Sequence, residues 1–188
     1  MDMFEGVGRR LDRKGGTLVN IGQNSLNGYE RKVLFRNNGD GTFTDVAFVN
    51  GADRPEDGRG LSIFDYDRDG QLDLLIRNFR QPAVLLHNQG RSGHWLQLKL
   101  VGVRSNRDAV GARLQIRTEA GLQTRSVTAG SAYLSGSSLV QHFGLGSTER
   151  VVAVDIDWPS GAHTRLHDVP ANHRYTVVEG VENAPPGS

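Results

Sequence analysis

The sequence contains no cysteine, which excludes disulfide bonds, thiolate metal sites and cysteine nucleophiles. It also lacks an apolar run of the ~20 residues that span a bilayer as a helix, so no membrane span is predicted. Lys and Arg total 22 against 21 Asp and Glu, for a net charge of +1, so we expect no binding to nucleic acid. The opening MDMFEGVGRR has no apolar segment after its charges, and no signal peptide is predicted there.

Hydrophobic residues are scarce as well, at 37% of the chain against roughly 45–50% in globular proteins when glycine is counted with them. Glycine, in contrast, is abundant, with 24 of 188 residues. The glycines are scattered and have no three-residue period, which excludes a collagen-like chain. This composition indicates many turns and short strands.

Short runs of apolar or β-branched residues recur at intervals of roughly 8–12 residues, each followed by Gly, Asn, Asp or Ser. Helical periodicity is scarce, so the sequence predicts an all-β fold. The expected strands cover residues 17–21, 32–36, 42–46, 61–64, 72–77, 83–87, 95–100, 112–118, 123–128, 139–143, 151–158, 163–167 and 175–178.

A weak internal repeat divides the chain. Leu34–Gly39 (LFRNNG) is similar to Leu85–Gly90 (LLHNQG), and a glycine-containing turn and a strand precede each copy. Periods of about 40–50 residues are typical of propeller blades. Acidic residues are less frequent after Arg91–Gly93, where we place a domain junction. The last six residues, NAPPGS, are predicted to be disordered.

The densest signal for chemistry is the acidic run Asp65–Asp73, DYDRDGQLD. Asp65, Asp67, Asp69 and Asp73 would repel one another without a cation, and calcium takes six to eight oxygen ligands in a flexible shell. Gly70 permits a sharp turn. The backbone carbonyl of Gln71 would supply a further oxygen. The run therefore predicts a calcium loop with ligands from Asp65, Asp67, Asp69, Gln71 and Asp73.

Other metal sites fit this run less well. An EF-hand needs a Glu at position twelve and flanking helices, but position twelve is Ile76 and a strand follows. Magnesium demands a stricter octahedral geometry, and zinc or copper would favour His or Cys. The remaining alternative is a solvated acidic turn without metal. The single-carboxylate segment Asn37–Thr42 is interpreted as a hairpin turn, and Leu11–Gly16, with one Asp and two cations, is not expected to bind calcium.

Several other polar groups invite a catalytic or metal-binding interpretation. His163 and His167 would lie about 13 Å apart along one strand face, too far for a shared metal. Asp155 and Asp157 share a strand face, and we favour a solvent-facing role over an acid pair. No Gly-x-Ser-x-Gly elbow is present, so the stretch 130–138 is interpreted as a turn. A catalytic site near this stretch would use His142 as a base and one of four serines as a nucleophile: Ser131, Ser135, Ser137 or Ser138.

Trp95 and Trp158 are expected in the core. Asn106 and Arg107 are expected to cap a loop or contact a ligand.

Gly58–Phe64 with the acidic run, and then Asn88–Gly90, resemble an FG-GAP/VCBS repeat, and Leu34–Val46 resembles the end of another. The second half is similar to the ASPIC/UnbV domain throughout. The blocks that carry this resemblance are HWL at 94–96, SNRDAVGA at 105–112, GSAYLS at 130–135, HFGLG at 142–146 and WPSG at 158–161.

The resemblance implies propeller blades with calcium bound at the acidic loop, on Asp65, Asp67, Asp69 and Asp73. It implies domains at 1–91 (one or two blade-like units, the first degenerate) and 92–182 (a β-sandwich-like ASPIC/UnbV domain), with a disordered tail at 183–188. Propellers close with about four to eight blades. One or two units cannot close, so they leave strand edges that soluble proteins usually cover. Millimolar calcium outside the cytoplasm favours an extracellular or periplasmic setting.

The expected function is that of a calcium-stabilised binding or assembly module. Its partner would be a protein, or a second copy that pairs through blade edges. One alternative is an enzyme or accessory protein of small-molecule biosynthesis, because the resembled family occurs in natural-product gene clusters. Another is a subunit of a larger complex.

Overall fold

The computed structural model describes residues 30–90, 93–130 and 134–181, together with the backbone of 8–11 and 17–20. It forms two compact units, residues 1–59 with 77–84 and residues 60–76 with 85–188. The described residues contain strands and no α-helix, so the all-β prediction is confirmed. Accordingly, no helix among them has the length and apolarity to cross a membrane.

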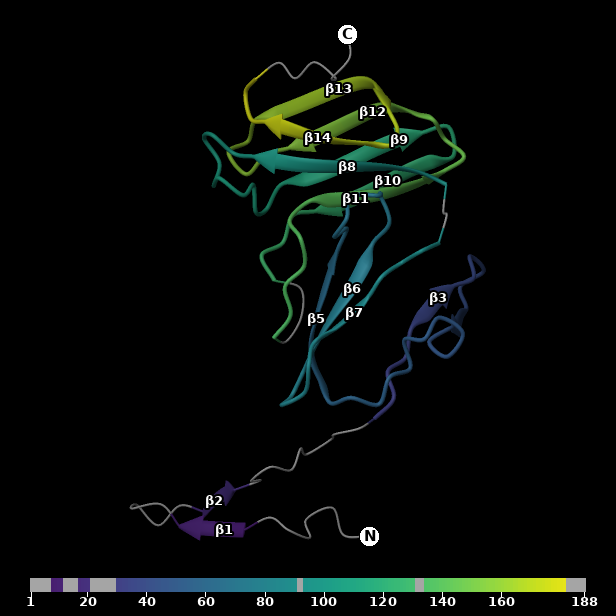
Figure 1. Cartoon of the computed structure of the whole chain (residues 1–188). Coiled ribbons are helices and arrows are strands. Elements are labelled where there is room, and N and C mark those ends of the chain that lie inside the picture. The colour runs from purple at the N-terminus through teal and green to yellow at the C-terminus, as the bar shows by residue number, and fades with distance from the viewer. Residues whose placement is uncertain (1–7, 12–16, 21–29, 91–92, 131–133, 182–188) are drawn as a thin grey trace. The chain divides into compact units, whose positions relative to one another are not determined.

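Seven described strands between residues 94 and 178 form a β-sandwich of two sheets that lie face to face (Figure 1). One sheet has the strand order β10-β9-β12-β13, with antiparallel neighbours throughout. The other has the order β11-β8-β14, in which β8 pairs antiparallel with β11 and parallel with β14. The strands are β8 (His94–Val101), β9 (Arg113–Thr118), β10 (Gly121–Ser126), β11 (Gln141–Gly146), β12 (Arg150–Asp157), β13 (His163–Pro170) and β14 (His173–Val178).

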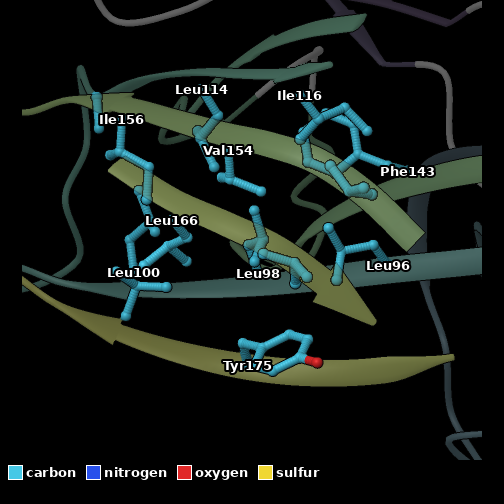
Figure 2. Close-up of a cluster of buried hydrophobic side chains, with 14 of the residues drawn as sticks. Leu96, Leu98, Leu100, Leu114, Ile116, Phe143, Val154, Ile156, Leu166 and Tyr175 are labelled. Atoms are coloured by element: carbon cyan, nitrogen blue, oxygen red, sulfur yellow. The ribbon is translucent and has the colours of Figure 1, made fainter. Parts of the chain in front are cut away.

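Alternating apolar side chains of the two sheets build the core between them. In β9, Leu114 and Ile116 are fully buried while their neighbours face outward, as the period of two requires. Figure 2 shows these side chains, with Val154 and Ile156 of β12, next to leucines of β8. Trp158 is also buried in this cluster, as expected from the sequence.

Glu179 fastens the end of β14 to two loops. Its Oε2 accepts backbone N–H bonds of 2.7 Å from each of Val103, Arg104 and Ser105. Its Oε1 accepts the hydroxyl groups of Ser105 and Ser160. Burial alone would raise the pKa of Glu179, but these hydrogen bonds outweigh it and lower the pKa to about 2. The carboxylate therefore stays ionised although its residue is 3% exposed.

A three-stranded sheet of order β5-β6-β7 precedes the sandwich in the sequence, formed by β5 (Gly58–Phe64), β6 (Asp73–Asn78) and β7 (Val84–Leu86). Residues 135–138 cover the outer edge of β5. The amides of Leu61 and Ile63 donate to the hydroxyl groups of Ser135 and Ser137, at 2.9 and 3.3 Å. Ser62 Oγ in turn donates to the Gly136 carbonyl at 2.6 Å.

Two hairpins lie nearer the N-terminus: β1 (Gly8–Leu11) with β2 (Thr17–Asn20), and β3 (Phe35–Asn37) with β4 (Phe43–Asp45). The β3–β4 connection is the hairpin turn expected at 37–42. Asp40 in this turn accepts the amide and hydroxyl of Thr42, and these hydrogen bonds lower its pKa. The turn therefore satisfies its single carboxylate internally.

Each expected strand is present within a few residues, and the sequence missed only β1 among the described strands. Asp155 and Asp157 do not form an acid pair. Asp155 accepts two bonds from the Arg165 guanidinium, and Asp157 contacts His163, so both belong to an outward ionic face. Asn106 caps its loop through reciprocal 2.8 Å bonds with Val110. The expected tail and the residue Ser131 lie outside the described residues.

Candidate cation site in the acidic loop

The acidic loop, residues 65–73, connects β5 to β6. Two of its residues adopt left-handed backbone conformations, Arg68 with φ 66° and Gly70 with φ 88°. Such conformations curl the chain within a few residues. The alternating aspartates are thereby wrapped around one turn, as the sequence pattern suggested.

Three aspartates use one carboxylate oxygen each to hold this turn. Asp65 Oδ2 accepts the Gly70 amide at 3.0 Å, Asp67 Oδ1 accepts the Asp69 amide at 3.3 Å, and Asp69 Oδ1 accepts the Gln71 amide at 2.7 Å. The other oxygen of each carboxylate takes no part in these bonds. Among the described residues, the buried Asp65 Oδ1 has no hydrogen-bond partner. A carboxylate oxygen of this kind fits a bound cation.

Asp73 has a different environment from the other three. Its side chain is fully buried, and it accepts the amides of Tyr66 at 3.0 Å and Asn88 at 2.8 Å. His87 Nδ1 lies 3.1 Å from the same oxygen that Asn88 contacts. Burial would raise the pKa of Asp73, but the hydrogen bonds from these three residues together lower it. Asp73 thus stays ionised and ties the loop to the segment after β7.

Strand β8 of the sandwich contacts the loop through two side chains. Gln97 is 4% exposed, and its Nε2 donates to Asp65 Oδ2 at 2.7 Å. The indole of Trp95 lies against Gly70, so a methyl group on Gly70 would overlap the ring. Trp95 is only half buried and is absent from the main core cluster. The sequence predicts Trp95 in the core, but its side chain packs on the loop turn instead.

A small pocket adjoins Asp65 where the loop meets the sandwich. Its volume of about 30 Å³ accommodates one or two waters. Burial lowers the pKa of His142, and nearby Asp65 opposes this effect. His142 Nδ1 has no hydrogen-bond partner among the described residues. The pocket is lined by Ile63, Phe64, Asp65, Leu72, Gln97, Ser138, Val140, His142 and Arg174.

The structure gathers the acidic groups into two overlapping clusters of three residues. In each cluster, every residue offers one ligand atom, and these atoms all lie within 4.8 Å of one another. Asp65, Asp67 and Asp69 form the first. Asp67, Asp73 and His87 form the second. Asp73 is therefore placed beside Asp67 but not within the first cluster. Gln71 is buried and its amide donates to Asp69; a ligand role for its carbonyl stays a prediction.

Comparison with known proteins gives these residues a family context. Residues 18–76 match the FG-GAP-like repeat, and residues 102–184 match the ASPIC and UnbV family. The chain is an FG-GAP-like repeat protein with an ASPIC/UnbV domain. It is homologous to cartilage acidic protein 1, with 33% identity to the Mus musculus protein and 32% to the Homo sapiens protein over 135 residues, or 69% of this chain. It spans about a fifth of the length of these relatives.

The FG-GAP-like match contains the whole acidic loop, whereas Trp95 and Gln97 lie between the two matched segments. Both residues were missed as parts of the site. The available signal was the polar Gln97 between Leu96 and Leu98, on the face of β8 opposite the core side chains. A sequence pattern alone assigns that face to solvent, but the structure buries Gln97 against the loop.

The serines that were candidate nucleophiles in the stretch 130–138 have structural roles where the structure describes them. Ser135 and Ser137 accept amides of β5, and Ser138 accepts the amide of Val140. Because His142 Nδ1 has no partner among the described residues, this nitrogen does not bond to any of these three serines. The hydroxyl groups thus serve as acceptors that hold backbone segments together.

Proposed function

We propose that this FG-GAP-like and ASPIC/UnbV chain is a calcium-stabilised interaction module. The supporting observation is the Asp65, Asp67 and Asp69 cluster, in which Asp65 keeps a buried oxygen without a partner among the described residues. Hard carboxylate oxygens on a flexible turn suit calcium. The three aspartates and the Gln71 carbonyl would hold the ion. Asp73, whose oxygens accept the amides of Tyr66 and Asn88, would brace the loop from inside.

Calcium would act here as a structural staple. Bound, it neutralises the mutual repulsion of the aspartates and fixes the chain between β5 and β6. A ligand that binds only the folded chain stabilises it by mass action, by about 2.7 kcal/mol when its concentration is a hundredfold above Kd. Calcium sites of extracellular modules have Kd values of roughly 10⁻⁴–10⁻³ M. We therefore propose that the chain operates in an extracellular or periplasmic setting.

Isothermal titration and thermal unfolding test this proposal directly. Millimolar calcium should raise the melting temperature relative to EDTA, and Asp67→Asn should weaken binding by at least about tenfold because it removes a charged ligand. In EDTA the same variant should be as stable as the unsubstituted protein or slightly more so, since one repulsive charge is gone.

Asp40→Asn is the matched control for that substitution, because Asp40 also lies in a turn but satisfies its carboxylate with Thr42. It should leave calcium binding unchanged. No heat of binding and no calcium-dependent change in melting temperature for the unsubstituted protein would refute the proposal.

The interaction role is supported by apolar side chains around the β3–β4 hairpin. A cluster of this kind on a small hairpin is typical of a surface that contacts another protein segment. We propose that a protein partner covers it. The test replaces Phe43 and Phe48 by Ser and measures self-association by light scattering, which should fall if a second copy covers these side chains. The exposed residues are Val33, Phe35, Phe43, Phe48 and Val49, each more than 60% exposed.

A further inference from the structure

The β-sandwich supplies part of the acidic loop's support, although the loop belongs to the repeat segment. Asp65, the first acid of the cluster, bonds to the Gln97 side chain across 32 residues of sequence. Gly70, the turn glycine, is covered by Trp95. Both partners lie on β8, two residues apart, and therefore on the same face of that strand. That face is opposite to the one that carries Leu96 and Leu98 into the core.

The buried state of Gln97 shows that this contact is built into the fold. An amide side chain that is 4% exposed is costly unless it is hydrogen-bonded. The bond at 2.7 Å from Gln97 Nε2 goes to a carboxylate oxygen of Asp65, and such bonds are stronger than those between neutral groups. It also fixes which oxygen of Asp65 faces the Gly70 amide and which remains available.

We propose that Gln97 and Trp95 are positioning residues for the cation site, so that calcium binding to the loop and the stability of the β-sandwich are thermodynamically linked. This inference rests on the proposed calcium function and adds that the repeat segment alone does not set the site's affinity. Groups that orient metal ligands from a second layer typically change metal affinity 10–100-fold when removed. Linkage between two regions is reciprocal, so calcium should also protect β8.

The first measurement compares calcium affinity by titration calorimetry. Gln97→Met keeps the side-chain length and removes the donor, and we expect about tenfold weaker binding. Lys99→Met is the control, because Lys99 lies on the same strand but is exposed. It should bind calcium as the unsubstituted protein does.

The second measurement follows tryptophan emission during calcium titration, first in the unsubstituted protein and then in two tryptophan variants. Trp95 lies against the loop turn and Trp158 lies in the sandwich core. Calcium should change the emission of the unsubstituted protein, and Trp95→Phe should abolish the change. Trp158→Phe, if it folds, should retain it.

The outcomes separate this inference from the proposed function. If the unsubstituted protein shows no heat of calcium binding, the proposed function fails and the linkage fails with it. If it binds calcium, but Gln97→Met binds within twofold of it and the tryptophan emission stays constant, the linkage alone is overturned. A tenfold loss for Gln97→Met with an unchanged Lys99→Met, together with a Trp95-dependent signal, establishes it.

Discussion

Glu179 and the aspartates of the acidic loop all accept backbone amides, but the protein satisfies them to different degrees. Glu179 receives three amides and two hydroxyl groups. Asp65 receives an amide and the Gln97 side chain on one oxygen, while its other oxygen has no partner among the described residues. Both groups lie in the same compact unit, so the contrast is local.

The difference separates a carboxylate whose acceptor capacity is filled by protein donors from one that keeps an oxygen for the proposed cation. A carboxylate has about four lone-pair sites, and the five donors around Glu179 use its capacity fully. No cation is needed there. In the loop, several negative charges converge with fewer protein donors. A carboxylate therefore holds two loops together at Glu179, whereas carboxylates form a candidate cation site in the acidic loop.

The largest effect on the melting temperature should come from removing the Glu179 carboxylate. Glu179→Ala leaves three amides and two hydroxyl groups without the acceptor of their partly buried hydrogen bonds, and donors that lose their acceptor away from water are costly. We expect it to lower the melting temperature more than any other substitution named here, equally in calcium and in EDTA. Differential scanning calorimetry in both conditions measures this. A loss confined to EDTA would show that the two carboxylate sites are not independent.

A smaller but specific effect is expected at the loop turn. Gly70→Ala forces a side chain into a conformation with φ 88° and into overlap with Trp95, which should cost about 2–4 kcal/mol. It should also weaken calcium binding. Gly136→Ala is the control, since a methyl group there meets no atom within 4 Å. Chemical unfolding curves for the two variants should differ clearly, and equal midpoints would contradict the close packing of Trp95.

The smallest effect concerns acid pH. Glu179 has its pKa lowered from 4.5 to about 2, so the unfolded chain binds more protons than the folded one between these values. The stability that Glu179 contributes is therefore present above about pH 4.5 and is lost as the pH falls towards 2. Asp73, whose pKa is also lowered, adds to the same slope. Urea midpoints at several pH values in EDTA measure it, and Glu179→Gln should flatten it.

Local patterns were sufficient to predict most of the strands. Alternation such as that of Leu114 and Ile116 depends only on neighbours in sequence. Strand β1 was missed because Gly8–Leu11 contains a single apolar residue and derives its strand character from pairing with β2. The boundary predicted at residues 91–92 stays a prediction, while the structure groups residues 60–76 with the sandwich in one compact unit.

The sequence predicted the acidic residues of the candidate site but not the contacts that hold them in place. The spacing of Asp65, Asp67 and Asp69 with Gly70 is a local signal, and the structure gathers these acids. The inward bonds of Asp73 and the contribution of Gln97 depend on long-range packing. No sequence pattern identified Glu179, because its partners come from loops about 75 residues upstream and from Ser160.

The serine-rich segment 135–138 has a consequence for the solubility of shortened versions of this chain. Its hydroxyl groups and backbone seal the outer edge of β5, where an unprotected strand edge would recruit other chains into extended sheets. A repeat segment expressed without the residues that follow it would expose the amides of Leu61 and Ile63. It would then be prone to pair edge to edge with other copies, a contact that segment 135–138 blocks in the longer chain.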